Sequence, residues 1–205
     1  MVSSARSALD SALKNPAYVD VSDFPLVIVD LRYGSKQNIL NKDVYQGFQR
    51  ALLHREAAQK FHTATSLLKK RHPQFRFLVF DALRPQAAQI EFWELVKGTP
   101  QQPFFADPAN GSIHSYGFAL DIGLAHASGE ELDMGTPFDD LTELAGPMHE
   151  ERMLREGKLN QEQVENRLVL RSLMIDSGFI QLPHEWWHYD ALPATEVRGR
   201  YPRCE

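Results

Sequence analysis

Hydrophobic residues along this chain occur in two patterns, short apolar runs and longer runs with a helical repeat. The short runs are rich in β-branched and aromatic residues, which favour the pleated surface of a sheet. They predict strands at residues 26–33, 75–83 and 118–124. A further strand-like stretch at residues 179–190 closes the fold.

The longest helical repeat lies between residues 47 and 71. Ala57, Phe61, Ala64 and Leu68 fall on one face of a helix, and the lysines of this segment lie largely outside that face. The proline that follows soon afterwards ends the pattern. We therefore predict a long amphipathic helix here.

Two further helices are indicated by the residues at their ends. Pro85 suits the first turn of a helix that runs to Gly98. Asn160 and Gln163 have the spacing of a capping box, and Gly178 is a suitable terminator for the helix that follows.

Loops are predicted where proline, glycine and asparagine gather, at residues 98–112, and again from the third strand to about residue 140. Strands and helices are mixed without a regular βαβ rhythm, and no repeat or linker-like segment divides the chain. We predict an α+β fold, with a small, mainly antiparallel sheet and helices packed against it in a single domain over residues 1–205.

Composition and charge narrow the classes of function. Of the 205 residues, 43% are hydrophobic, which suffices for one substantial core. The formal net charge is -5 and the 22 basic residues are scattered, so nucleic acid is not an expected partner. No apolar run reaches the length of a membrane span, and the N-terminus lacks the apolar core of a signal peptide. We expect a soluble cytoplasmic or periplasmic protein, whose oligomeric state the sequence leaves open.

The chain has one cysteine, Cys204, so it cannot form an intramolecular disulfide. Its place beside the C-terminus predicts a frayed end and argues against a catalytic thiol. No glycine-rich phosphate loop and no Gly-x-Ser-x-Gly elbow is present. Side chains that can bind a metal therefore become the main lead.

Residues 184–188 read His-Glu-Trp-Trp-His, the spelling of a helical zinc-protease motif. In that motif both histidines lie on one helical face and bind zinc, and the glutamate acts as general base. Here Pro183 directly precedes the motif, and Trp186, Trp187 and Tyr189 favour a strand. The spelling fits the motif, but its neighbours argue against a helix.

A second group of candidate ligands lies in the stretch SIHSYGFALD. His114 and Asp121 are seven residues apart, which in an unbroken strand would point them to opposite faces. Gly117 tolerates unusual backbone angles, so a bend there would allow both side chains to face one point. Spacing alone does not distinguish this arrangement from a surface histidine and a strand-end aspartate.

Together, the segments SIHSYGFALD and EWWH resemble the paired signature of the zinc D,D-peptidase superfamily, Ser-x-His-x-x-Gly-x-Ala-x-Asp followed near the C-terminus by Glu-x-x-His. Within it the chain resembles the D-alanyl-D-alanine dipeptidases, including the vancomycin-resistance type. The blocks VDLRYGSKQN, FDALRP and MGTPFD match that subgroup in order and approximate spacing. The resemblance spans about residues 26–190, and the two-part metal signature is its most specific element.

The resemblance implies a zinc site in a central cleft, with one Zn²⁺ per chain held by His114, Asp121 and His188. It also implies that Glu185 is the general base and that His184 is not a ligand. Three protein ligands would leave a fourth position for water, which is the arrangement of catalytic zinc.

Four further residues match family positions around this centre. Arg84 matches the arginine that stabilises the developing oxyanion, and Asp139 matches the position proposed to hold the substrate's free ammonium. Ser112 and Tyr33 match positions that line the same small pocket. Each also has an ordinary structural explanation, as a surface arginine, a helix cap, a turn residue or a core residue. After Asn38 the family typically continues with Phe-Thr-Gly, whereas this chain has Ile-Leu-Asn, which leaves the pocket rim and the exact dipeptide preference open.

Other residues are expected in structural roles. Trp186 and Trp187 are predicted in the core and the pocket wall, and residues 146–157 as a solvated helical face. The remaining histidines are expected to be solvated or in the core: His54, His62, His72, His126 and His149.

The leading hypothesis is a zinc metallodipeptidase, a hydrolase that splits D-alanyl-D-alanine or similar D,D-dipeptides of peptidoglycan and cell-wall chemistry. One alternative is a peptidoglycan D,D-carboxypeptidase of the same superfamily, which acts on longer stem peptides. A second is a non-catalytic, zinc-stabilised binding module. Asp139 and the lack of an appended wall-binding domain favour the dipeptidase, and Glu185 argues against the module, because a structural metal needs no base. The physiological pathway and the metal loaded in the cell stay open.

Overall fold

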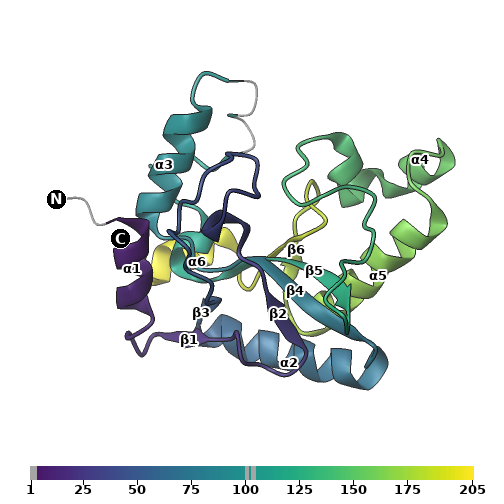
Figure 1. Cartoon of the computed structure of the whole chain (residues 1–205), viewed down its shortest axis with the longest axis horizontal. Helices are drawn as coiled ribbons and strands as arrows, with labels where there is room; N and C mark the ends of the chain where they lie inside the picture. Colours follow the sequence, from purple (N-terminus) through teal and green to yellow (C-terminus); the bar gives the residue numbers. More distant parts are fainter. Residues whose placement is uncertain (1–3, 100–101, 103–104) are drawn as a thin grey trace.

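The computed structural model describes residues 4–99, 102 and 105–205, and its main sheet has five strands in the order β2-β4-β5-β7-β6 (Figure 1). β2 (Val27–Val29) is parallel to β4 (Phe75–Asp81). The other neighbours pair antiparallel and are β5 (Ala119–His126), β7 (His188–Asp190) and β6 (Ile180–Gln181). The predicted α+β class with a mainly antiparallel sheet is therefore confirmed.

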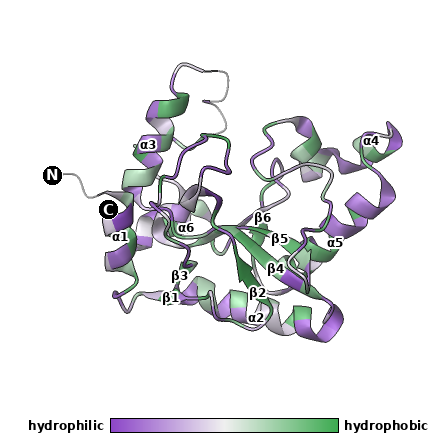
Figure 2. Ribbon diagram, in the orientation of Figure 1, coloured by the Kyte–Doolittle hydropathy of each residue, from purple (hydrophilic) through white to green (hydrophobic). Residues whose placement is uncertain are grey.

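Helices cover this sheet and a small second sheet, in which β1 (Tyr18–Asp20) pairs with β3 (Leu52–His54). α2 and α5 pack on each other and on β4 and β5, α1 packs on α3, and α6 packs on the short helix η3. Figure 2 shows the central strands as strongly hydrophobic and the helices as mixed. The helices are α1 (Ala5–Ala12), α2 (Arg55–Arg71), α3 (Gln86–Val96), α4 (Glu150–Arg155), α5 (Gln161–Asp176) and α6 (Ala194–Arg200), and the 3-10 helices are η1 (Arg32–Gly34), η3 (Ile113–Tyr116), η4 (Glu143–Ala145) and η5 (Pro147–His149).

The helix predicted for residues 47–71 is real but begins only at Arg55. The four apolar residues that predicted it are buried as expected. Before it, Gly47 has a φ of 73°, which a right-handed helix cannot contain, and Leu52–His54 pair with β1 instead. The predicted start was therefore wrong, because a short strand joins directly onto the helix.

Two predicted strands are shorter than expected. Of residues 26–33 only Val27–Val29 form a strand, because the chain then turns into η1 and carries Tyr33 into the interior. The stretch 179–190 is split into β6 and β7 by bends at residues 182–187, where Pro183 has no N–H to offer a sheet. As predicted, the His-Glu-Trp-Trp-His segment is not helical.

The predicted helix ends agree well with the structure. α3 starts directly after Pro85, the capping box of Asn160 and Gln163 is formed, and Gly178 follows α5 with a φ of 92°. The predicted loop 98–112 includes residues 100–101 and 103–104, which lie outside the described residues. The elements α1, β1 and α6 were not predicted, although Ser4 caps α1 and small residues recur along its buried face.

The C-terminal segment is not frayed, contrary to expectation. The backbone N–H of Cys204 donates to the carbonyl of Ser115 at 2.7 Å, and its carbonyl accepts from the N–H of Gln86 at 2.7 Å. Burial raises the pKa of the Cys204 thiol to about 11, so it stays protonated near neutral pH. The C-terminal segment thus joins η3, which contains His114, to the start of α3, which follows Arg84.

The predicted solvated helix at residues 146–157 is only partly solvated, because Glu150 is buried. Its carboxylate pairs with Arg167 at 3.4 Å and with Arg171 at 2.5 Å, both on α5. Arg167, 1% exposed, also donates to the carbonyls of Met134 at 2.7 Å and Leu144 at 3.0 Å. The guanidinium of Arg167 therefore fixes both ends of the segment that runs from Met134 to Leu144. Among the described residues no helix is long and apolar enough to cross a membrane.

Candidate active site

Three polar residues form a row across the centre of the main sheet. Asp81 on β4 is the partner of Asp121 on β5, next to an irregularity in the register, and Asp121 is the partner of His188 on β7. Residues that face each other across antiparallel strands hold their side chains on the same face, about 5 Å apart. The register of the sheet therefore gathers two carboxylates and one imidazole.

His114 reaches the same place from η3, outside the sheet. The helix ends at Gly117, whose φ of 74° turns the chain into β5, so the bend predicted between His114 and Asp121 is present. A β-carbon at this glycine would lie 2.8 Å from the backbone nitrogen of His54 and 3.0 Å from the ring of Tyr18. Both the backbone angle and the close approach require glycine here.

His114, Asp121 and His188 form one buried group that could hold a metal ion. Nδ1 of His188 lies 2.9 Å from Oδ1 of Asp121 and 3.2 Å from Nε2 of His114. Nε2 of His114 lies 3.2 Å from Oδ1 of Asp121. Two nitrogens and one oxygen therefore converge on one point, as predicted from the sequence.

Each imidazole has a partner that fixes the role of its second nitrogen. Nδ1 of His114 is 2.7 Å from the carbonyl of Ala82, which can only accept, so this nitrogen carries the proton and Nε2 is free. Nε2 of His188 is 2.9 Å from the carboxylate of Asp190, which turns Nδ1 towards Asp121 and His114. Such outer partners orient metal-binding histidines in many proteins.

The electrostatics of the group favour a charged aspartate. Burial opposes ionisation of Asp121, but the adjacent His114 and His188 lower its pKa well below the usual range. Burial also opposes protonation of His188, yet Asp190 and Asp121 raise its pKa well above the usual range. A proton on His188 therefore gives Asp121 and Asp190 a positive partner.

Arg84 lies beside this group and is almost fully buried. Its guanidinium pairs with Asp81 at 2.7 Å and with Asp121 at 3.4 Å, and lies over the rings of Tyr33 and Phe92. The phenol of Tyr45 donates to the other oxygen of Asp81 at 2.8 Å. Arg84 is therefore held in one position inside the protein, and the alternative that it is an ordinary surface arginine is wrong.

A cavity of about 150 Å³ opens over the three donors and is lined by all of them, Arg84, Tyr33, Asp139 and Glu185. It is smaller than the roughly 300–1,000 Å³ usual for sites of drug-sized ligands, so it suits a small ligand. Leu141, Leu182, Phe105 and Trp187 supply apolar walls. Trp186 and Trp187 are both buried, as predicted.

Glu185 and Asp139 are the two carboxylates of the cavity outside the donor group. An oxygen of Glu185 is 3.8 Å from Nδ1 of His188, and burial raises the pKa of Glu185. Asp139 accepts a hydrogen bond from the phenol of Tyr33 at 2.8 Å. Burial raises the pKa of Asp139 to about 8, although the Tyr33 hydrogen bond acts in the opposite direction. Asp139 has a φ of 62°, a left-handed conformation that aspartate tolerates better than most residues.

Three residues have different outcomes. Ser112 is buried directly before η3 but does not line the cavity, so the structure does not bring it together with the other predicted substrate residues. His184 is exposed and lies outside the donor group, as expected. Asp139 does not cap η4, since Thr142 accepts from the backbone there.

Three residues that support the site were not predicted from the sequence. Asp81 was visible in FDALRP, three residues before Arg84, but the bond between them was not predicted. Asp190, two residues after His188, follows the alternation of a strand and so lies on the same face. Tyr45 lies far away in the sequence and gave no local signal.

A buried nitrogen and oxygen donor group with an open small cavity, a nearby carboxylate and a fixed arginine is typical of metal-dependent hydrolases. Residues 17–204 match the model of the peptidase M15 family, described as D-ala-D-ala dipeptidase. The chain therefore belongs to the D-Ala-D-Ala dipeptidase family.

Curated relatives agree with the family. The chain is 33% identical over 167 residues to a D-alanyl-D-alanine dipeptidase of Escherichia coli (strain K12), which covers 82% of this chain and 80% of the relative. It is 30% identical over 191 residues to one of Synechocystis sp. (strain ATCC 27184 / PCC 6803 / Kazusa), with 77% of each chain covered. A shorter match, 36% over 83 residues, links it to one of Enterococcus faecalis (strain ATCC 700802 / V583), covering 40% of this chain and 37% of the relative. The family membership supports a hydrolytic enzyme of the dipeptidase type.

The raised pKa of Asp139 predicts a change in stability with pH. Between its ordinary pKa of 3.8 and about 8, the folded metal-free protein keeps a proton that the unfolded chain has lost, so Asp139 lowers stability as the pH rises. Asp139→Asn removes this effect. The variant should therefore gain stability relative to the parent between pH 5 and pH 8, measured by urea unfolding of chelator-treated protein. An equal difference at both pH values would show that Asp139 has an ordinary pKa.

Proposed function

We propose that this protein is a zinc-dependent dipeptidase that hydrolyses D-alanyl-D-alanine, or closely similar D,D-dipeptides, to free amino acids. We further propose that residues 1–205 act as one catalytic domain with one Zn²⁺ per chain. The observation that carries the proposal is the convergence of His114, Asp121 and His188, with mutual distances of 2.9–3.2 Å, in the wall of a small cavity.

The donor group fits zinc in number, type and spacing. Zinc with ligand bonds of ~2.0–2.1 Å and tetrahedral geometry has ligands about 3.4 Å apart, close to the distances between these donors. Two imidazoles and one carboxylate would hold the ion and leave a position open towards the cavity. When bound, the ion would supply Lewis acidity to water and to the scissile carbonyl.

Glu185 is the proposed general base, and its place in the cavity and its raised pKa support this role. It lines the same cavity and lies beside His188, and burial raises its pKa. A carboxylate of raised pKa accepts a proton from the attacking water more readily and returns it to the departing amine. The same residue would therefore serve both halves of the hydrolysis.

Arg84 would stabilise the negative charge that develops on the carbonyl oxygen. Its guanidinium lines the cavity and is already fixed by Asp81 and by contact with the rings of Tyr33 and Phe92. A charge held in place before the reaction does not need to reorganise in the transition state. The arginine acts through position as much as through charge.

Asp139 would hold the free ammonium of the dipeptide, with Tyr33 keeping its carboxylate in place. An ammonium group next to Asp139 favours the ionised carboxylate and so counteracts the effect of burial on its pKa. Ser112 is buried directly before η3 and does not line the cavity, so this proposal gives it no substrate contact. The preference for a free N-terminus separates this proposal from a D,D-carboxypeptidase.

The first prediction of this proposal concerns the metal. His114→Ala should lose zinc, measured as metal per chain in purified protein, because a three-ligand site cannot readily spare a ligand. His184→Ala is the matched control and should keep one zinc per chain. Full zinc in His114→Ala, or loss of zinc in His184→Ala but not in Asp121→Ala, would favour the helical His-Glu-x-x-His arrangement instead.

A second prediction concerns the base. Glu185→Gln should keep zinc and the fold but lose at least about a hundredfold in turnover, the usual scale for a positioned base. Metal content and thermal unfolding serve as controls that separate chemistry from structure. Near-normal turnover of D-alanyl-D-alanine by this variant would remove Glu185 from the reaction.

The decisive experiment compares D-alanyl-D-alanine with its N-acetyl form. Acetylation removes the ammonium and leaves Asp139 without its partner in a small cavity, so the ratio of kcat/KM should exceed about a hundredfold. Asp139→Ala should reduce that ratio. A ratio near one, or one that favours the acetylated peptide, would identify the protein as a carboxypeptidase.

A further inference from the structure

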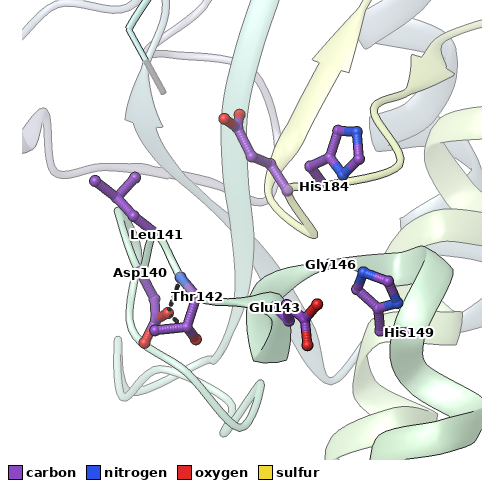
Figure 3. Close-up of a pocket in the computed structure, with 8 residues that line it drawn as sticks. Asp140, Leu141, Thr142, Glu143, Gly146, His149 and His184 are labelled. Atoms are coloured by element: carbon purple, nitrogen blue, oxygen red, sulfur yellow. Dashed lines mark hydrogen bonds between the residues drawn. The ribbon is translucent and has the colours of Figure 1, made fainter. Parts of the chain in front are cut away.

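Glu185, the proposed general base, lies between two spaces. It lines the catalytic cavity and also an adjacent pocket of about 390 Å³, whose other walls include residues 140–143 and His184 (Figure 3). In the described part of the chain no hydrogen bond holds its carboxylate, and the 3.8 Å to Nδ1 of His188 is beyond hydrogen-bond distance. The side chain has room to turn away from the catalytic cavity, so its position depends on the backbone that carries it.

That backbone has no regular structure, since it lies in the bends between β6 and β7. Trp186, directly after Glu185 and 2% exposed, is bonded at three places. Its N–H donates to the carbonyl of Ala145 at 3.1 Å, and its carbonyl accepts from Nε2 of Gln181 at 3.3 Å. Its indole N–H donates to Oγ1 of Thr136 at 2.8 Å. Trp186 therefore fixes the chain immediately after the proposed base.

The partners of Gln181 determine which way its amide points. Its Oε1 accepts from Nε of Arg171 at 2.6 Å, and a guanidinium can only donate. Nε2 must therefore face the carbonyl of Trp186 and the phenol oxygen of Tyr189, which is 2.9 Å away. Arg171 is itself paired with the buried Glu150 at 2.5 Å. The bond to Trp186 is thus set by a chain of partners that reaches α4 and α5.

Thr136 joins Trp186 to the segment that carries the proposed ammonium site. It lies three residues before Asp139 and is buried. An indole N–H can only donate, so without the hydroxyl of Thr136 it would be buried and unpaired. One hydrogen bond therefore connects the segments of the two proposed functional carboxylates, Asp139 and Glu185.

We propose that Thr136 and Gln181 are positioning residues, which keep Glu185 in the catalytic cavity by holding Trp186. Neither of them lines that cavity, so they act on the base and not on the substrate. The inference rests on the proposed function and deepens it.

The neighbouring metal donor has restraints of its own. His188 is paired with Asp121 across β5 and β7, and its Nε2 is 2.9 Å from the carboxylate of Asp190. Loss of a positioning residue should therefore affect the proposed base and leave the proposed zinc ligands in place.

The test compares Thr136→Val with Thr136→Ser in the zinc-loaded enzyme, with D-alanyl-D-alanine as substrate. Valine has nearly the shape of threonine but offers the indole no acceptor, whereas serine keeps the hydroxyl. Thr136→Val should lower kcat by about tenfold, since a misplacement of ~1 Å can cost about a hundredfold, and should keep KM within about twofold and one zinc per chain. Thr136→Ser should restore most of the turnover. Thr65→Val, which removes a buried hydroxyl bonded to the carbonyl of His62 on α2, is the matched control and should leave kcat unchanged.

A double-mutant cycle separates positioning from general damage to the fold. In a Glu185→Gln background the base is already absent, so Thr136→Val should cause no further loss of the residual turnover. An equal loss in both backgrounds would show that Thr136 does not act through Glu185.

Gln181→Glu provides a second arm, which also tests the inference if Thr136→Val does not fold. The new carboxylate can still accept from Arg171 and from the phenol of Tyr189, but it has no N–H for the carbonyl of Trp186. This variant should show the same fall in kcat and the same dependence on Glu185.

NMR reads the hydrogen bond of Trp186 without reference to activity. Its indole N–H signal, assigned with Trp186→Phe, should move upfield in Thr136→Val and stay near the parental position in Thr136→Ser.

Three results would overturn the inference: full kcat in Thr136→Val and Gln181→Glu, a loss that is independent of Glu185, or a loss of zinc that accounts for the fall in turnover. Failure of the proposed function looks different, because the zinc-loaded parent would then not hydrolyse D-alanyl-D-alanine, and both proposals would be wrong.

Discussion

Asp81 and Asp121 lie side by side on adjacent strands inside the protein, and the structure depends on how their negative charges are compensated. Two carboxylates so close cannot both stay ionised in a buried place without positive partners. Arg84 supplies one, at 2.7 Å from Asp81 and 3.4 Å from Asp121. The imidazoles of His114 and His188 face the remaining oxygen of Asp121, where a proton or a metal cation completes the balance. The same charge pairs thus stabilise the fold and form the site.

This constraint explains why the site is rigid. Arg84 is held by Asp81 through Coulomb attraction, by Tyr33 and Phe92 through contact with their rings, and by a backbone bond from its N–H to the carbonyl of His114 at 3.1 Å. The phenol of Tyr45 satisfies the second oxygen of Asp81. Each donor therefore has its orientation set before any ligand arrives, which is the condition for electrostatic stabilisation of a transition state.

The sequence predicted those parts of the site that follow local rules. Gly117 predicted the bend that brings His114 to Asp121. Pro183 and the aromatic residues beside it argued against a helical zinc motif. What the sequence could not supply was pairing between distant strands. The register that sets Asp121 opposite His188 is a property of the assembled sheet, and so is the reach of Tyr45 to Asp81. The incorrect secondary-structure predictions have the same origin. A short strand such as β3 depends on pairing with a neighbouring strand more than on the strand propensity of its own residues.

The proposed metal donors and the proposed substrate contacts belong to different parts of the fold. Asp121 and His188 lie on paired strands of the core sheet, whereas Asp139 lies on a connecting segment whose ends are held by the buried Arg167. Such segments can change sequence without disturbing the strands. The chain departs from the family pattern at Ile-Leu-Asn, and Ile39 and Asp139 line one shared hollow of about 440 Å³ outside the catalytic cavity. Variation at this rim therefore acts beside the residue proposed to bind the ammonium group and leaves the proposed metal donors unchanged. We expect members of the family to differ in their choice of dipeptide before they differ in their chemistry.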